Sequence, residues 1–260
     1  MSWTRGACDL GDVRVSYLRT GGARPPVVLL HGLMGSGACW TLLARTLEAD
    51  FDVIMPDARG HGASSAPAHG YAYAQLADDV VALVRALGLV RPCVVGHSMG
   101  GMTAAIVAGR LALERVVLVD PTFLSPARQA EVHASDVAAQ HAQALALSHA
   151  DLVARARARS PERPLELVEL QAAARLQTSL AAFAVLAPPN PDYRAVVRAI
   201  DAPTLLVIGD QPVVTRAMAD ELAALQPRLR VAEIAGAGHG LPFDQPARLA
   251  DVVGAFLRAP

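Results

Sequence analysis

Short, uninterrupted apolar runs that alternate with helical segments constrain the fold of this chain most strongly. These runs are Pro26–Leu30, Phe51–Met55, Pro92–Val95, Arg115–Val119 and Thr204–Ile208, and Val13–Arg19 adds a stretch of alternating polarity. Continuous runs of this length are typical of strands buried on both faces. Between and after them, apolar residues recur on one helical face, at Leu76, Val80, Leu83 and Leu87 and again at Leu249, Val252, Val253 and Phe256. This alternation predicts an α/β fold with a mostly parallel sheet flanked by helices.

The alternation stops between Pro121 and Ile200. This segment is alanine-rich, lacks a convincing strand and is interrupted near its end by the proline cluster Pro188–Pro191. We interpret residues 121–200 as a helical lid inserted into the fold, and residues 1–120 and 201–260 as the α/β core that carries it. A chain of 260 residues, 53% of them hydrophobic, suits one such domain better than two independent ones.

The charge balance narrows the class of partner. Lys and Arg together number 23 and Asp and Glu 24, so the formal net charge is −1. Because no basic field is present to attract nucleic acid or a membrane surface, we expect a small-molecule ligand and neither of those partners. The three cysteines, Cys8, Cys39 and Cys93, lie far apart without zinc-ligand spacing, so we expect no metal site.

The N-terminal stretch MSWTRGACDLGDV lacks the apolar core of a signal peptide, and no 18-residue apolar span predicts a membrane helix. We therefore expect a cytoplasmic protein. Monomer and homodimer both remain open.

The stretch VVGHSMGG, Val94–Gly101, places Ser98 between a predicted strand and a predicted helix over Met102–Arg110. A serine on such a sharp turn projects its hydroxyl from a strained backbone, and the residues two before and two after it must be very small. Gly96 and Gly100 occupy those positions. The following helix N-terminus favours developing negative charge. These features predict that Ser98 is a nucleophile rather than a passive turn residue.

A second turn, HGLMGSGACW, follows the early strand that ends at Leu30. We expect its Leu33 N–H, together with the Met99 N–H, to form an oxyanion hole. His239 follows a late β-like run, Arg230–Ile234, in a glycine-rich loop, and a histidine titrates near neutrality, so it is the preferred general base. His133, His141 and His149 recur every eight residues, which rotates each by about 80° around a helix and argues against a shared metal.

These residues resemble the α/β-hydrolase family. HGLMGSGACW, DARGHGASSAP (Asp57–Pro67), GHSMGG and GAGH occur in that family's order and spacing across essentially the whole chain. The resemblance implies an eight-stranded, mostly parallel sheet, Ser98 as nucleophile, His239 as base and a helical lid after the sixth strand. It assigns Asp57 and Arg59 to a turn with a structural role.

The acid that orients the histidine departs from the usual pattern. In most relatives it lies three residues after a glycine that ends the seventh strand, and here that position holds Pro212, in the stretch Gly209–Val214. Asp120, directly after Arg115–Val119, resembles the acid of a haloalkane dehalogenase subgroup and of certain lipases. We favour Asp120, and Asp210 is the alternative.

Together these residues predict a cofactor-independent serine hydrolase. The expected substrate is a small, partly apolar ester, lactone, thioester or activated amide, cleaved through an acyl-enzyme. The alternatives are a non-hydrolytic enzyme of the same fold (C–C cleavage, lyase or cofactor-free dioxygenase) and a ligand receptor with a vestigial triad. Arg155, Arg157, Arg159 and Arg163 lie in the lid, where we expect a solvated surface; anchoring of a substrate carboxylate is the alternative.

Overall fold

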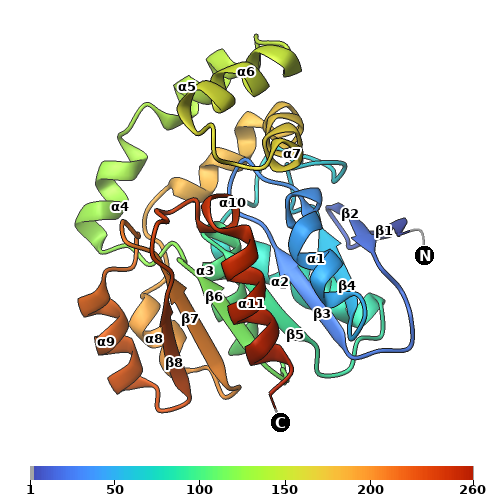
Figure 1. The fold of residues 1–260 in the computed structure, drawn as a ribbon, viewed down its shortest axis with the longest axis vertical. Coiled ribbons are helices and arrows are strands. Elements are labelled where there is room, and N and C mark those ends of the chain that lie inside the picture. The colour runs from blue at the N-terminus through green and yellow to red at the C-terminus, as the bar shows by residue number, and fades with distance from the viewer. Residues whose placement is uncertain (1–2, 260) are drawn as a thin grey trace.

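The computed structural model describes residues 3–259, which contain one eight-stranded sheet (Figure 1). The strands are β1 (Thr4–Asp9), β2 (Arg14–Arg19), β3 (Pro26–Leu30), β4 (Asp52–Pro56), β5 (Cys93–His97), β6 (Val116–Val119), β7 (Thr204–Ile208) and β8 (Leu229–Glu233). Their order is β1-β2-β4-β3-β5-β6-β7-β8, with β2 antiparallel to both β1 and β4 and every other pair parallel. The predicted α/β class and mostly parallel sheet are confirmed, and the runs with continuous apolar character are the central, fully buried strands.

Helices cover both faces of the sheet and bury a separate apolar cluster on each. One face carries α1 (Thr41–Leu47) and α11 (Pro246–Leu257), which contact each other, preceded by the short turns η1 (Gly37–Trp40) and α10 (Leu241–Asp244). The other face carries α2 (Tyr73–Ala86), α3 (Met99–Ala108), α8 (Tyr193–Arg198) and α9 (Arg216–Leu225), packed in that order. No helix within residues 3–259 is long and apolar enough to cross a membrane.

Residues 121–200 form helices between β6 and β7. They are α4 (Pro126–His133), α5 (Val137–Ala144), α6 (His149–Arg159), α7 (Leu165–Leu176), η2 (Leu180–Leu186) and α8. Figure 1 shows α5, α6 and α7 above one edge of the sheet, whereas α8 returns to pack against α3 and α9. The proline cluster separates η2 from α8, since a proline cannot supply the N–H that continues a helix. We call residues 121–187 the cap.

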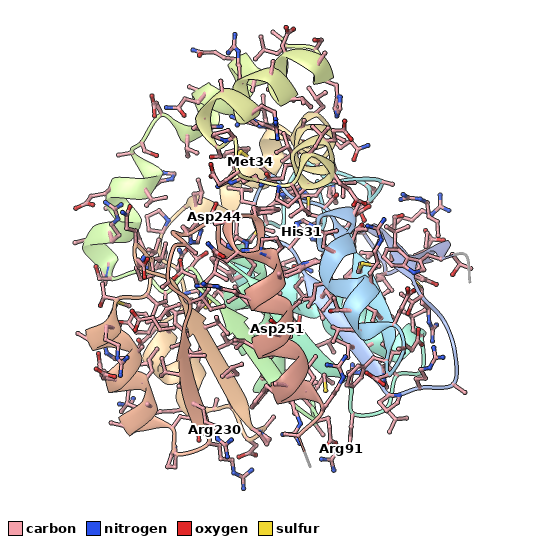
Figure 2. All side chains as sticks on the ribbon, in the orientation of Figure 1. His31, Met34, Arg91, Arg230, Asp244 and Asp251 are labelled. Carbon is pink, nitrogen blue, oxygen red and sulfur yellow. The ribbon has the colours of Figure 1, made fainter. Side chains whose placement is uncertain are left out.

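The edge of the sheet beneath the cap is the carboxyl edge. Figure 2 shows His31, which follows β3, near this edge, whereas Arg91 and Arg230 lie at the opposite end of the molecule. Parallel strands place their carboxyl ends at one edge, and ligands of open α/β sheets bind there. The chain therefore brings the residues that follow β3, β5, β6 and β7 together under the cap.

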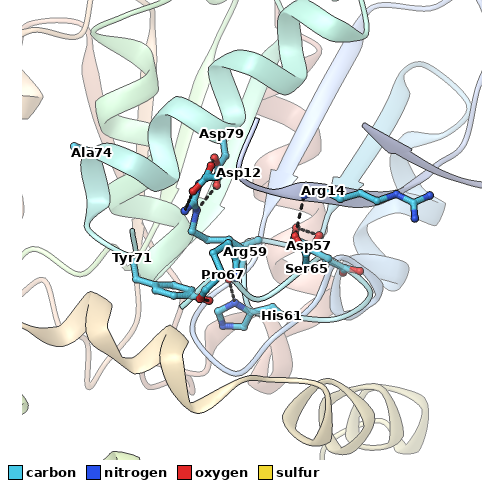
Figure 3. A network of polar contacts seen from close by, with 12 residues as sticks. Asp12, Arg14, Asp57, Arg59, His61, Ser65, Pro67, Tyr71, Ala74 and Asp79 are labelled. Carbon is cyan, nitrogen blue, oxygen red and sulfur yellow. Dashed lines mark hydrogen bonds and ion pairs between the residues drawn. The ribbon is translucent and has the colours of Figure 1, made fainter. Parts of the chain in front are cut away.

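The turn after β4 is held by a buried ionic network (Figure 3). Arg59 is 0% exposed and donates to both carboxylate oxygens of Asp79 at 2.7 Å and to Asp12 at 3.1 and 3.2 Å. Burial disfavours its charge, but these hydrogen bonds outweigh that penalty and raise the pKa of Arg59. Asp57 accepts hydrogen bonds from the Gly37 and Ala63 amides. Arg59 thus ties this turn to α2 through Asp79, and Asp57 holds the η1 turn against the end of β4.

Candidate active site

Ser98 lies on the turn from β5 to α3 in a left-handed conformation, with φ 54° and ψ −117°. A side chain on Gly96 would place its Cβ 2.1 Å from the Gly100 carbonyl oxygen, and one on Gly100 would lie 2.3 Å from the Leu30 oxygen. Both positions therefore require glycine, as the sequence predicted. The Ser98 amide donates to the Val119 oxygen at 3.1 Å, which ties the turn to β6.

Ser98, His239 and Asp120 form a continuous hydrogen-bonded chain. The Ser98 Oγ lies 2.9 Å from His239 Nε2, and His239 Nδ1 lies 2.6 Å from Asp120 Oδ2. The Asp120 side chain is 0% exposed, whereas that of His239 is 41% exposed on the cavity described below. With a proton on Nδ1, the imidazole donates to the carboxylate and accepts from the serine hydroxyl, which is the arrangement that a general base requires.

Asp120 is held by backbone donors from the β7–α9 loop, the loop in which the usual acid is absent. Its Oδ2 also accepts from the Val213 N–H and its Oδ1 from the Val214 N–H, each at 2.9 Å. These bonds satisfy a carboxylate that would otherwise be costly to bury. Asp120 itself adopts φ 37°, a left-handed value that is uncommon for a residue other than glycine.

Asp210, the alternative acid, is exposed and contacts the Gly236 amide rather than His239. Its Oδ2 accepts from the Gly236 N–H at 2.5 Å, so it closes the turn that leads to His239. The Asp210 amide donates to the Ala237 oxygen at 2.7 Å, a close approach that only a glycine at position 209 permits, since a Cβ there would lie 2.3 Å from the same oxygen. The β7 loop thus supports the histidine loop through backbone contacts.

His97, which the sequence analysis left without a role, fixes the backbone of the proposed base. Its Nε2 donates to the His239 carbonyl oxygen at 2.8 Å, and the two rings lie 5.1 Å apart between centroids. Burial and the neighbouring His239 lower the pKa of His97 to about 3, so it stays neutral. The sequence places His97 next to Ser98, which suggests a role at the site, but it does not reveal that His97 contacts the His239 backbone.

The loop after β3 lies directly against Ser98, since a Cβ at Gly32 would be 3.1 Å from the Ser98 Cβ. His31 holds this loop by donating from Nδ1 to the Gly32 oxygen and accepting at Nε2 from the Ala58 amide. Within residues 3–259, neither the Leu33 N–H nor the Met99 N–H has a protein acceptor, and both residues line the cavity. Two free donors at such a position are suited to a developing oxyanion.

Thr122 also lies beside the serine and was not singled out from the sequence. Its Oγ1 is 3.4 Å from Ser98 Oγ, and its hydroxyl is hydrogen-bonded to Tyr73. Burial raises the pKa of Tyr73 to about 12. At 3.4 Å the two hydroxyls are in contact without a strong hydrogen bond, because such bonds are typically 2.5–3.0 Å long. The Ser98 hydroxyl therefore remains available to His239.

One cavity of about 1100 Å³ joins the serine to the cap. Its floor contains Ser98, His239 and the β3 and β7 loops, and its roof comes from α5, α6 and α7. Trp40 lines it as well, is 3% exposed and has an indole N–H without an acceptor in the described chain. Arg155, Arg157 and Arg159 are exposed, as expected for a solvated lid surface, and Arg155, Arg159 and Arg163 also line this cavity, whereas Arg157 does not.

Known proteins share this architecture over nearly the whole chain. A family profile described as "alpha/beta hydrolase fold" matches residues 25–246. N-formylmaleamate deformylase from Pseudomonas putida is 30% identical over 98% of this chain and 97% of its own length. The crystal structure of an enol-lactonase from Burkholderia xenovorans LB400 superposes with a TM-score of 0.78 at 25% identity, covering 98% of this chain and all of the lactonase. E-2-(acetamidomethylene)succinate hydrolase superposes with a TM-score of 0.85 over 99% of this chain and 100% of its own, and at 24% identity it shows the shared fold. This chain is a member of the α/β-hydrolase family.

Proposed function

We propose that this protein is a serine hydrolase that cleaves a carboxylic ester, lactone, thioester or activated amide of a small molecule through an acyl-enzyme on Ser98. The observation that carries the proposal is the Ser98–His239–Asp120 chain, with contacts of 2.9 and 2.6 Å beneath a cavity of about 1100 Å³. The relatives support acyl chemistry, since one is named a deformylase and another an enol-lactonase.

In the acylation step, His239 Nε2 takes the Ser98 proton while Oγ attacks the substrate carbonyl. The new C–O bond places negative charge on the former carbonyl oxygen, which the Leu33 and Met99 amides stabilise. The imidazolium then returns the proton to the leaving alcohol, thiol or amine as its bond to the acyl carbon breaks. Asp120 holds the Nδ1 tautomer and stabilises the imidazolium throughout.

In the deacylation step, a water molecule replaces the leaving group. His239 takes a proton from the water, hydroxide adds to the acyl carbon, and Ser98 leaves with that proton restored, which releases a carboxylic acid. The cap acts as a lid that covers the cavity and restricts the size of the acyl group. His97 is a positioning residue, because it acts on the substrate only through the His239 backbone.

A fluorophosphonate probe and p-nitrophenyl esters test the proposal on the full chain. We expect covalent labelling at Ser98, found by peptide mass spectrometry, and a burst of p-nitrophenol equal to the enzyme concentration when deacylation is slow. The Ser98→Ala variant is the control and is expected to show neither. A folded wild-type protein that is not labelled and hydrolyses no ester, lactone or thioester would contradict the proposal.

A further inference from the structure

The cavity wall carries an unusual charge pattern that the proposed acyl chemistry does not use. Its lining within the described chain includes no Asp or Glu, but it includes arginines from α4, α6 and α7 and the loop between α6 and α7: Arg128, Arg155, Arg159, Arg163 and Arg175. From this pattern we infer that the cavity binds substrates whose acyl or leaving group carries a carboxylate, and that Arg175 is its main receptor. This inference rests on the proposed function, because it assumes that the substrate is cleaved at an acyl group by Ser98.

Two of these arginines are already neutralised by protein carboxylates. Arg163 forms an ion pair with Asp244 at 2.6 Å, with both side chains largely buried, and this pair joins the cap to the helix after His239. Arg128 pairs with Glu131 at 2.6 Å on the surface of α4. Both guanidinium groups already have a counterion, so we expect an incoming anion to bind them less tightly than an unpaired arginine.

Arg175 differs because it is half-buried and has no counterion among the described residues. Its Nε is buried without a hydrogen-bond acceptor, and its guanidinium makes no hydrogen bond or ion pair with any residue between 3 and 259. Burial, with the nearby charge of Arg159, lowers the pKa of Arg175. An unpaired buried cation is costly, whereas a bound carboxylate accepts two parallel N–H bonds from a guanidinium and removes that cost.

Arg159 and Arg155 extend the positive charge along the same wall. Both lie on the exposed part of α6, four residues apart and so on one face, and neither forms an ion pair within the described residues. Arg157, between them, lies off the cavity and donates weakly to the Pro161 and Arg163 carbonyls. The roof thus presents a cationic face that attracts an anion toward Arg175.

The position of this face defines the substrate class. Ser98 lies on the sheet edge and Arg175 on α7 of the cap, and both line the same cavity. A substrate that contacts both has a scissile acyl group at one end and a carboxylate apart from it, as in a hemiester or a monoamide of a dicarboxylic acid. The buried Trp40 N–H is a further donor in this cavity for a polar group of such a compound.

A ratio of two activities tests the inference. We compare kcat/KM for p-nitrophenyl hemiglutarate, which is anionic, with that for p-nitrophenyl butyrate, which is neutral. Arg175→Met keeps an apolar stem and removes the charge, and we expect it to lower the anionic-to-neutral ratio by roughly 10- to 100-fold. Arg175→Lys should retain part of the ratio. Arg157→Met, which removes the same charge outside the cavity, is the matched control and should change the ratio by less than about twofold.

Binding of glutarate, measured by calorimetry on the full chain, separates this inference from the proposed function. We expect wild type to bind glutarate more tightly than glutaramide, and Arg175→Met to lose that preference without a lower melting temperature, since Arg175 has no hydrogen bond or ion pair to lose among the described residues and Met keeps the apolar packing of its stem. A wild-type protein that hydrolyses the neutral ester but shows no preference for glutarate would overturn the inference and leave the proposed function intact. Glutarate binding through Arg175 without ester hydrolysis would sustain the anion site and overturn the serine hydrolase. An unchanged ratio in folded Arg175→Met would also overturn the inference.

Discussion

Replacing Asp120 by Asn separates the proposed acid from its alternative, and the geometry gives the expected cost. Asp120 accepts three hydrogen bonds, from His239 Nδ1 and Val213 N on Oδ2 and from Val214 N on Oδ1. An Asn side chain offers one oxygen and one NH2 group for these positions. If its oxygen takes the Oδ2 position, the NH2 group faces the Val214 N–H. If the NH2 group takes that position, it faces the Val213 N–H instead.

Either orientation therefore leaves one backbone N–H opposite a donor, which is expected to lower the free energy of unfolding by about 1–3 kcal/mol. The effect on turnover is larger. In the first orientation His239 keeps its tautomer but loses the carboxylate that stabilises the imidazolium. In the second, Nδ1 must become an acceptor, so Nε2 carries the proton and is unable to accept one from Ser98. Both lead us to expect a loss of about 10,000-fold in kcat, equivalent to about 5 kcal/mol.

The assay is p-nitrophenyl ester hydrolysis by wild type, Asp120→Asn and Asp210→Asn, with circular dichroism and melting curves to establish that each variant is folded. Asp210 contacts the Gly236 amide and not His239, so its substitution should change kcat by less than about threefold. A folded Asp120→Asn variant within tenfold of wild type would refute the reasoning. So would an Asp210→Asn variant with the greater loss.

Three further perturbations follow from the same geometry. Ser98→Ala should lower ester turnover roughly 100,000-fold and abolish fluorophosphonate labelling, and retained labelling would point to another nucleophile. Gly96→Ala would place a Cβ 2.1 Å from the Gly100 oxygen, so we expect it to lower the unfolding free energy in urea by about 3 kcal/mol, and an unchanged midpoint would argue against this close approach. Burial lowers the pKa of His61 and of His97 to about 3, so the unfolded chain takes up protons below about pH 6.5 that these folded imidazoles do not. Each should therefore remove about 2 kcal/mol of stability between pH 7 and pH 5 in urea denaturation, and equal stability at the two pH values would contradict this.

The sequence predicted the central strands to within one or two residues because burial on both faces leaves an uninterrupted apolar signal. It did not predict β1, which pairs with β2 through its backbone at the sheet edge and exposes most of its side chains. Edge strands of this kind are held by backbone hydrogen bonds, which carry no compositional signal.

The candidate site was also predictable only where residue types carry a signal, and not where backbone groups alone make the contacts. Ser98 stands in a turn whose glycines are required by close backbone approach, and His239 stands in a glycine-rich loop in which Gly236 has φ 77°, so the pattern of residue types carries the prediction. The donors to Asp120 are backbone amides, which any residue other than proline supplies at positions 213 and 214, so no particular side-chain pattern reveals them. Arg155 and Arg159 are four residues apart and so share one face of α6, but this spacing does not indicate whether that face meets solvent or a cavity.

Asp120 lies just before the cap and is held by the β7–α9 loop, which follows the cap, and this position has a consequence for protein engineering. Asp120 is followed directly by Pro121, and the cap ends before the proline cluster that precedes α8, a helix that belongs with the layer formed by α3 and α9. A cassette running from residue 123 to residue 187 therefore excludes Ser98, His239, Asp120 and the Val213 and Val214 amides, but it includes Arg163, whose ion pair with Asp244 an exchanged cap has to supply again. Recombination at these two junctions would transfer the arginine-bearing roof from one scaffold to another without replacing Ser98, His239 or Asp120.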